Sequence, residues 1–497
     1  MLRYSSPPVN ATTYDLLPYE DYCFAATHPE HLFTVSRLFG HRAPDFGTSR
    51  VLELGCARGG NLLPMALDLP DATFVGIDLS ARQIDEGLAQ LRRIGVRNIT
   101  LETRSIMDLD ASFGAFDYVI CHGVYSWVPE PVRDAILARC RDLLTPAGVA
   151  YVSYNTLPGW DIGRSLRDFL LMNLAATANV KEKVARAREA LRALIVGLKS
   201  QPGAHAAAFR VEAESLLDVP DSYLFHEYLE TSNDPVYFRE FVERARAFGL
   251  DHLADADLRS AIPESTIELE QSVDFIRGRR FRASLLVRTA PRERIAMDIA
   301  QLAHCHVSTR LELAEDSTED ALRADSPLRF THDGKPLQVT SAMSKCALAT
   351  LIETQRRPIA YVEWCARIAR RLGLSDPRSV AARLITEADV RGWIAAGFLD
   401  LHAGPARFAD DASLRPLACP LARDQATYGT RVSNRRHVQL DLDAFEHTLL
   451  PLLDGTHDRA ALRTALQTRS GAMSEGALAG RIEEALEWLA LNALLIA

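Results

Sequence analysis

A short stretch around residue 55 combines an acidic side chain with closely spaced small residues. Glu53 lies near the end of an apolar run, and Gly55, Ala57 and Gly59 follow at every second position. Because glycine has no Cβ, a turn of this composition lets the backbone approach a bound ligand closely. The pattern therefore indicates a ligand site where a strand passes into a helix.

Alternating short apolar runs and helical stretches must position this turn. We expect strands at 50–55, 73–78, 98–103, 116–121 and 148–153 and helices at 59–69, 80–94 and 130–144, with Ser80 as an N-cap. Strands that alternate with helices predict a parallel sheet of an α/β domain, whose ligand crevice lies at the carboxyl ends of the strands. Two later strands, 250–253 and 280–288, are expected to return to this sheet.

A glycine-rich turn between strand and helix is common to dinucleotide and S-adenosylmethionine sites, so the context must separate the two. Here the spacing resembles E-x-G-x-G-x-G, the first motif of class I methyltransferases, with Ala57 in place of the middle glycine. The resemblance implies a Rossmann-like fold and S-adenosylmethionine as cofactor. It implies that Asp78 holds the ribose hydroxyls, that Glu53 faces the cationic methionine moiety, and that Asn61 helps to fix its carboxylate end.

The same resemblance assigns further residues to the cofactor. Where the family commonly has an acidic residue after the third strand, this chain has Ser105 followed by Ile106, whose backbone would read the adenine ring. His122 either flanks the adenine or relays a proton, or else makes a simple structural hydrogen bond. The remaining cofactor-binding residues that we expect are Leu79 and Gln83, next to Asp78, and Tyr14, which either belongs to an N-terminal lid with Tyr19 and His28 or packs as a hydrophobic cover.

A more distinctive resemblance extends over residues 10–289. The chain looks like methyltransferases that carry a methyltransferase regulatory domain, and characterised relatives include bacterial protein lysine methyltransferases that act on outer-membrane proteins. The motifs that carry this resemblance are Tyr14-Asp15, Thr27-His28-Pro29, His122 to Pro129, Val152 to Thr156, Phe225 to Leu229 and Asn233 to Pro235.

A lysine acceptor would require an in-line displacement at the sulfonium methyl group by a neutral amine. An apolar, aromatic channel favours the neutral amine by desolvation, and no strong base or metal is needed. Our candidates for this acceptor channel follow the fourth and fifth strands and are Tyr125, Trp127, Tyr154 and Asn155.

The rest of the chain predicts several domains. We expect a discontinuous methyltransferase domain at 1–163 and 236–298, a helical insertion at 164–235 that is part of the regulatory segment, and a linker at 299–326. A winged-helix-like domain at 327–409 would follow, with 397–402 and 407–409 as its wing, and then a mainly helical domain at 410–497. A long-period helical stretch spans about 164–198 within the insertion.

Composition limits the possible partners. The 56 basic and 65 acidic residues give a net charge of -9, so no global basic field attracts nucleic acid or anionic lipid. Residues 327–402 include eleven basic and seven acidic residues. This positive excess is small, so we do not favour nucleic-acid binding by this segment. The eight cysteines include no C-x-x-C pair, and we expect a cytoplasmic protein without disulfides, a metal site, an export signal or a membrane span.

We therefore predict an S-adenosylmethionine-dependent methyltransferase that acts on lysine side chains of a protein. For its assembly, we keep a homodimer open. Two alternatives stay open at this point. One is a small-molecule N- or O-methyltransferase, although such an enzyme rarely needs about 200 residues beyond its catalytic core. The other is a cofactor-binding regulator whose C-terminal region binds nucleic acid.

Overall fold

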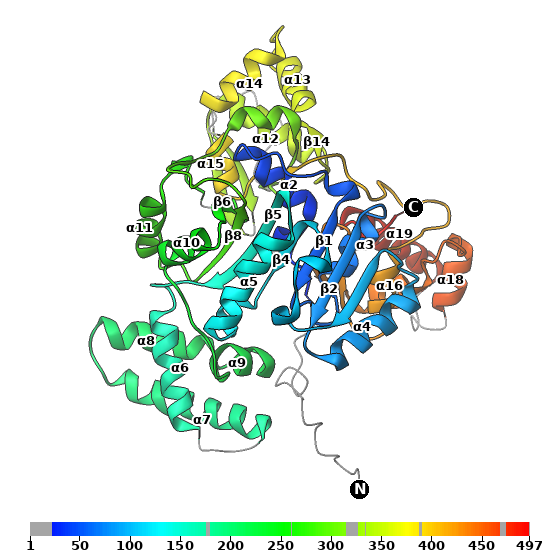
Figure 1. Cartoon of the computed structure of the whole chain (residues 1–497). Helices are drawn as coiled ribbons and strands as arrows, with labels where there is room; N and C mark the ends of the chain where they lie inside the picture. The colour runs from blue at the N-terminus through cyan, green and yellow to red at the C-terminus, as the bar shows by residue number, and fades with distance from the viewer. Residues whose placement is uncertain are drawn as a thin grey trace.

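A computed structural model of the 497-residue chain describes residues 22–174, 179–259, 261–314, 327–332, 334–386, 390–467 and 474–496. At its centre lies a twisted sheet of seven strands in the order β3-β2-β1-β4-β5-β8-β6 (Figure 1). The strands are β1 Arg50–Leu54, β2 Thr73–Asp78, β3 Ile99–Thr103, β4 Phe116–Cys121, β5 Leu144–Asn155, β6 Asp251–Asp255 and β8 Phe281–Val287. The first five are parallel, and β8 runs antiparallel to both β5 and β6. The five predicted strands and the return of two later strands are thus confirmed.

Helices on the sheet follow the predicted pattern. Helices α3 (Leu62–Asp68) and α4 (Ala81–Ile94) pack against β2 and β3, α5 (Glu130–Leu143) packs against β4 and β5, and α10 (Phe238–Ala247) packs against β6. The hydroxyl of Ser80 accepts a hydrogen bond from the Gln83 amide at 3.1 Å, so the predicted N-cap of α4 is confirmed. This cap fixes the start of α4 directly after Asp78.

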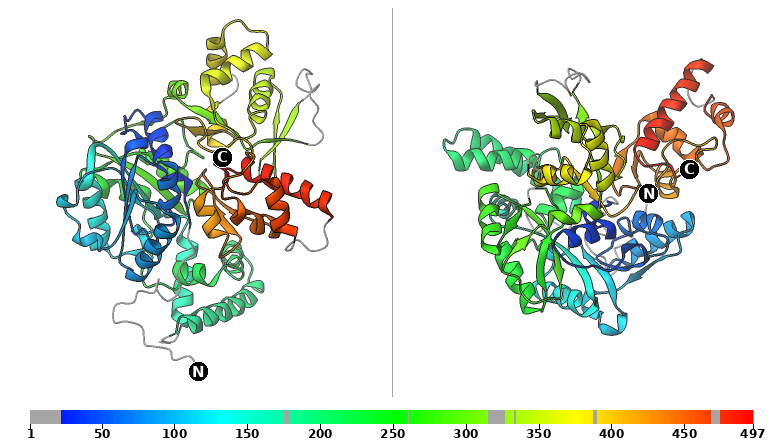
Figure 2. Two further views of the ribbon diagram at one scale, coloured as in Figure 1. Left: turned by 90° about the vertical axis from the view of Figure 1, so that its right-hand side faces the viewer. Right: turned by 90° about the horizontal axis from the view of Figure 1, so that it is seen from above.

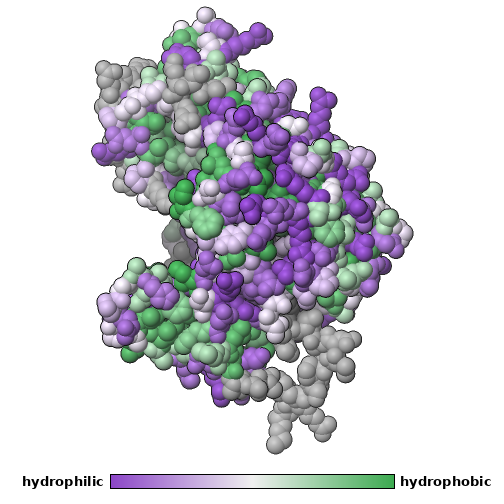
Figure 3. Space-filling view, turned by 60° about the vertical axis from the view of Figure 1, so that its left-hand side comes forward, coloured by the Kyte–Doolittle hydropathy of each residue, from purple (hydrophilic) through white to green (hydrophobic). Residues whose placement is uncertain are grey.

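A separate helical unit lies between β5 and α10, below the sheet in Figure 1. It contains α6 (Asp161–Asn173), α7 (Val180–Lys199), α8 (Ala204–Ser215) and α9 (Asp221–Tyr228). Its apolar side chains form their own core, which includes Leu166, Leu191 and Phe225. The predicted continuous helical stretch at 164–198 is wrong in one respect, because α6 ends at Asn173 and α7 begins at Val180. Figure 3 shows the surface hollowed between this unit and the part of the molecule above it.

The chain beyond β8 first forms a small mixed unit. Antiparallel strands β12 (Leu328–His332) and β13 (Lys335–Val339) precede helices α12 (Ala342–Ile352), α13 (Tyr361–Arg371), α14 (Pro377–Thr386) and α15 (Val390–Ala395). The wing expected from 397–402 and 407–409 is not formed. Strand β15 (Asp400–His402) instead pairs with β10 (His306–Ser308), and the Arg407 guanidinium, outside any strand, binds the carboxylates of Glu30 and Asp68. These acidic partners are distant in sequence and gave no local signal.

The last segment packs directly on the domain that contains the seven-stranded sheet (Figure 2). It comprises α16 (Pro420–Gln425), a hairpin of β16 (Arg431–Ser433) and β17 (Gln439–Asp441), and helices α17 (Ala444–Leu449), α18 (Arg459–Gln467) and α19 (Glu475–Leu491). Asp424 of α16 accepts hydrogen bonds from Gln90 and Arg93 of α4, each at 3.0 Å. Within the described segments, the helices lack the combination of length and apolar character that crossing a membrane requires.

A buried ion network ties the returning strands together. The Arg282 side chain of β8 is fully buried and donates to Asp274 of α11 (Ile267–Arg277), with both contacts at 2.8 Å. It also donates to Asp255 of β6 at 2.5 Å and to Glu270 at 2.9 Å. The network therefore couples two strands and one helix far from the glycine-rich turn.

Replacing Arg282 by methionine should strongly destabilise the fold, because it removes the fully buried cation among three carboxylates, of which only Asp255 and Asp274 keep a contact with Arg279. We expect a loss of about 3–5 kcal/mol in the free energy of unfolding, measured by urea denaturation. The control is Arg288→Met, at an exposed position just beyond the same strand. A loss for Arg282→Met no larger than for this control would contradict the structural role of the network.

Candidate functional site

The turn between β1 and α3 is built from residues in the left-handed backbone region. Gly55, Ala57 and Gly59 have φ values of 78°, 50° and 79°. A Cβ at Gly55 would lie 2.6 Å from a methyl carbon of Val124, so the loop after β4 leaves no space for a side chain there. Ala57 adopts this conformation although it carries a Cβ, which costs on the order of 1 kcal/mol. The backbone therefore forms a tight cradle at the carboxyl end of β1.

Asp78, the last residue of β2, faces this cradle. One oxygen of its carboxylate accepts a hydrogen bond from the Ala57 amide and the other from the Ser80 amide, both at 2.9 Å. A carboxylate only accepts hydrogen bonds, and its two oxygens together have about four lone-pair sites. Of the neighbours predicted with it, Leu79 is 65% exposed, whereas Gln83 is buried in the first turn of α4.

Glu53 is buried deeper in the same crevice, at 3% exposure. Its Oε1 accepts a hydrogen bond from Asn61 Nδ2 at 2.7 Å, while Oε2 is buried with no hydrogen-bond partner among the described residues. Burial raises the pKa of Glu53 to about 7, with Asp78 adding to the rise and the Asn61 hydrogen bond opposing it. A buried carboxylate oxygen without a donor is costly, and a cationic ligand at this point would satisfy it.

The third strand delivers Ser105 and Ile106 to the same edge. Thr103, at the end of β3, lies in register with Asp78, and the Ser105 hydroxyl accepts a hydrogen bond from the Met107 amide at 3.1 Å. This bond caps a short 3-10 helix that begins at Ile106, a half-buried residue. Ser105 and Ile106 thus lie beyond Asp78, where the sequence predicted them.

His122, directly after β4, joins a group of aromatic residues that was not predicted, in which Tyr151 is buried, His122 and Phe24 are half-buried, and Phe281 is exposed. Its Nδ1 lies 2.9 Å from the Tyr151 hydroxyl, and its ring centroid lies 3.7 Å from that of Phe24 and 6.0 Å from that of Phe281. Burial lowers the pKa of His122 to about 4, so the imidazole is neutral at neutral pH. The sequence contains a signal that separates Tyr151 from Tyr154. Side chains alternate along a strand, so these two tyrosines of β5 lie on opposite faces of the sheet.

The structure separates the predicted acceptor residues into two groups. Tyr125 and Tyr154, each 1% exposed, pack with Phe241 of α10; the Tyr154 ring stacks on Phe241 at 3.9 Å and its hydroxyl lies 2.9 Å from the Ser284 hydroxyl. Burial raises the pKa of Tyr125 to about 12. These two tyrosines therefore belong to the core under α10, and are not brought together with His122 and Tyr151.

The other two predicted acceptor residues are Asn155, the last residue of β5, and Trp127, which follows β4. The Asn155 amide donates to the Ser126 hydroxyl at 2.9 Å, and its Nδ2 donates to Asn233 Oδ1 at 3.1 Å. Trp127 ends a 3-10 helix, Tyr125–Trp127, and is half-buried. Through these bonds the ends of β4 and β5 contact the segment that precedes α10.

The N-terminal segment covers the Glu53 side of the crevice. Tyr14 and Tyr19 lie outside the described residues, but the chain from Tyr22 onward is described. The Phe24 amide donates to Asn61 Oδ1 at 3.0 Å, and Asn61 Nδ2 lies 3.0 Å from the Thr27 hydroxyl. Neither Phe24 nor Thr27 was predicted as a site residue, since the partner residue Asn61 follows more than thirty positions later.

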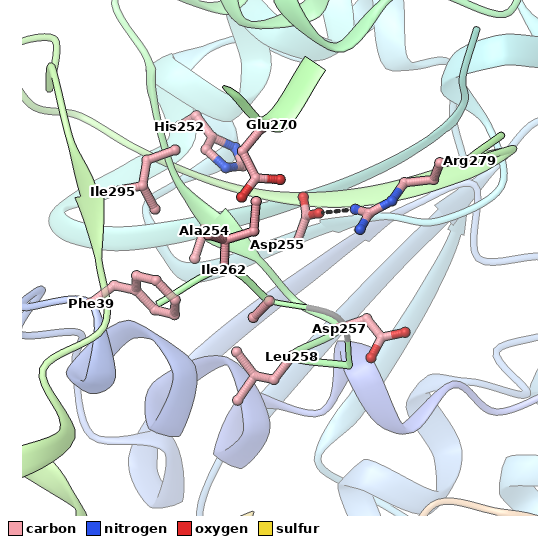
Figure 4. Close-up of a pocket in the computed structure, with 11 residues that line it drawn as sticks. Phe39, His252, Ala254, Asp255, Asp257, Leu258, Ile262, Glu270, Arg279 and Ile295 are labelled. Carbon is pink, nitrogen blue, oxygen red and sulfur yellow. Dashed lines mark hydrogen bonds and ion pairs between the residues drawn. The ribbon is translucent and has the colours of Figure 1, made fainter. Parts of the chain in front are cut away.

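A second polar pocket, at the far edge of the sheet, is too small for a substrate (Figure 4). It is lined by His252, Asp255 and Arg279 among others and has a volume of about 20 Å³. This space holds about one water molecule. Asp255 Oδ1 and His252 Nδ1, both buried without a partner among the described residues, would be satisfied by such a water.

Three family models match the chain. The model of a methyltransferase domain matches residues 51–148, that of a predicted methyltransferase regulatory domain matches 220–270, and that of a C-terminal winged helix domain of PKMT matches 415–494. The first match contains the cradle, Asp78 and His122. The winged-helix match contains the β16–β17 hairpin and falls within the segment that we expected to be mainly helical, because three-residue strands leave little pattern in a sequence.

One curated relative and one solved structure are similar to nearly the whole chain. The uncharacterized protein RP789 of Rickettsia prowazekii is 34% identical over 91% of this chain and 85% of its own length, and RP028 of the same organism is 38% identical over 48% and 95%. The structure of PKMT2 from Rickettsia typhi in complex with AdoHcy has a TM-score of 0.85 at 28% identity and covers 97% of this chain and 100% of that one. The chain belongs to the class I S-adenosylmethionine-dependent methyltransferases that carry a methyltransferase regulatory domain.

Proposed function

We propose that this methyltransferase transfers methyl groups to lysine side chains of a protein substrate. The observation that carries the proposal is the likeness to PKMT2 of Rickettsia typhi along the whole chain, including the winged helix domain at 415–494. Small-molecule methylation would not need the additional surface that the segments after β8 provide. A protein substrate, in contrast, benefits from the additional surface that these segments provide.

The residues of the crevice fit the cofactor. We assign Glu53 Oε2 to the ammonium group of the methionine moiety, since this buried oxygen lacks a donor, and Asp78 to the two ribose hydroxyls. The backbone at Gly55, Ala57 and Gly59 approaches the ligand most closely. Asn61 acts through Glu53, because its NH₂ group already donates to Glu53 and Thr27 and its oxygen cannot donate to a carboxylate. The remaining proposed contacts are those of Leu79, Gln83, Ser105, Ile106, His122 and the N-terminal Tyr14. When bound, S-adenosylmethionine supplies an electrophilic methyl group on a sulfonium.

The acceptor site must hold the lysine amine in its neutral form. A neutral His122 and the aromatic rings around it add no positive charge and disfavour an ammonium by desolvation. We assign direct contact with the acceptor to Trp127 and Asn155. Tyr125 and Tyr154 are 1% exposed and pack in the core under α10, so we assign them only a supporting role behind these residues. The Asn155 hydrogen bond to Asn233 holds its amide in place for this task.

The test is to incubate the purified chain with methyl-labelled S-adenosylmethionine and a bacterial lysate, and to separate protein, nucleic acid and small molecules. We expect label in protein and, after acid hydrolysis, in methylated lysine. Asp78→Ala is the control for activity from contaminants. Label in the small-molecule or nucleic-acid fraction alone would reject the proposal and favour the corresponding alternative.

Asp78→Ala should weaken the binding of S-adenosylhomocysteine, because the ribose hydroxyls lose their charged acceptor. Hydrogen bonds to a charged group contribute about 1.5–3 kcal/mol each, so we expect at least a tenfold rise in the dissociation constant measured by calorimetry. Asp85→Ala, on an exposed position of α4, is the matched control. Equal affinities of the two variants would remove Asp78 from the ribose site.

The raised pKa of Glu53 predicts a pH dependence of cofactor binding. With a pKa of about 7, the carboxyl group is mostly protonated at pH 6 and mostly charged at pH 8, and only the charged form attracts an ammonium. The affinity of the native chain relative to Glu53→Gln should therefore rise about tenfold from pH 6 to pH 8. The ratio cancels the titration of the cofactor's own amine. A ratio that is constant with pH would show that Glu53 does not face the ammonium.

A further inference from the structure

The tip of the β16–β17 hairpin places a histidine against the proposed cofactor site. His437 is 4% exposed and has a φ of 58°, in the left-handed region that disfavours residues with a Cβ. The turn is held by Asn434, whose Oδ1 accepts hydrogen bonds from the amides of Arg436 and Val438, both at 2.9 Å. A glycine would adopt this backbone without strain, so the position of the imidazole is maintained at an energetic cost.

The imidazole contacts Asn61, and the donors around Asn61 fix the direction of that contact. His437 Nε2 lies 2.9 Å from Asn61 Oδ1, and the same oxygen accepts the Phe24 amide at 3.0 Å. Because a backbone amide only donates, the Asn61 oxygen must face Phe24, and His437 Nε2 must then carry the proton. The Asn61 NH₂ group consequently faces Glu53 Oε1.

Two arginines of the C-terminal part of the chain bind the far end of α3, and one of them, Arg435, belongs to the hairpin. Arg435 donates to one oxygen of Asp68, the last residue of α3, at 2.9 Å, and Arg407 donates to the other oxygen at 2.9 Å. Asn61 immediately precedes α3, so the C-terminal segment contacts both ends of this helix. The His437 contact therefore belongs to an extensive interface between the two domains.

We propose that the winged helix domain completes the cofactor site, with His437 as a positioning residue. The imidazole fixes the Asn61 amide, which binds one oxygen of Glu53 and leaves the other for the cofactor's ammonium group. The inference rests on the proposed assignment of Glu53 and Asn61 to the methionine moiety. By linkage, docking of the C-terminal segment and cofactor binding strengthen each other.

Two substitutions of similar size at position 437 separate orientation from packing. His437→Gln keeps an N–H donor near the place of Nε2, whereas His437→Leu removes it, and both variants bear the same backbone strain. In the full chain, we expect His437→Leu to weaken S-adenosylhomocysteine binding about tenfold by calorimetry and His437→Gln to stay within about threefold of the native value. Native affinity for His437→Leu, or equal losses for both, would overturn the proposal.

A control and a double substitution complete the test. Arg431→Gln changes an exposed residue of the same hairpin, whose ion pair with Asp441 lies within the hairpin, and its affinity should stay within about threefold of native; a loss as large as that of His437→Leu would overturn the positioning role. In a Glu53→Gln background, His437→Leu should cause little further loss, and simple additivity would also overturn it. If Glu53→Gln alone binds S-adenosylhomocysteine like the native chain, the assignment of Glu53 to the ammonium group is wrong. If Glu53→Gln weakens binding and His437→Leu does not, the assignment of Glu53 stands and only the inference about His437 is wrong.

Discussion

The buried carboxylate of Glu53 is the constraint around which the crevice is organised. It lies on β1, between β2 and β4 in the sheet, with one oxygen bound to Asn61 and the other without a donor. Removing a carboxylate from water is expensive unless it is paired, so the site is electrostatically incomplete until a cation enters. The cofactor carries two positively charged groups, an ammonium and a sulfonium. Its binding would compensate a cost that the fold carries by itself.

Elements far apart in the sequence converge on this carboxylate through Asn61. The N-terminal segment reaches it through Phe24 and Thr27, and the C-terminal hairpin reaches it through His437. A Rossmann-like sheet alone would leave the Asn61 amide open to solvent on these sides. The C-terminal domain of this chain therefore does more than enlarge its surface, because it also covers Asn61 beside the proposed amino-acid end of the cofactor crevice.

The parts of the structure that depend on local pattern were predictable. Apolar runs followed by a glycine turn identified β1 and the cradle, and Ser80 identified the start of α4, directly after Asp78 at the end of β2. Contacts between distant segments were not predictable from one sequence. His437 belongs to a hairpin with three-residue strands, and nothing near it in sequence points to Asn61. Alternation along β5 did show that Tyr151 and Tyr154 face opposite sides of the sheet. We had instead selected Tyr154 because it follows the predicted fifth strand, without considering which face it occupies.

The most direct measurement of the central claim is a crystal structure of the full chain with S-adenosylhomocysteine. The account predicts the ligand's ammonium nitrogen within hydrogen-bond distance of Glu53 Oε2, its ribose hydroxyls on Asp78, and the His437 to Asn61 contact intact. An amino-acid moiety bound elsewhere, with Glu53 Oε2 still lacking a donor, would contradict it.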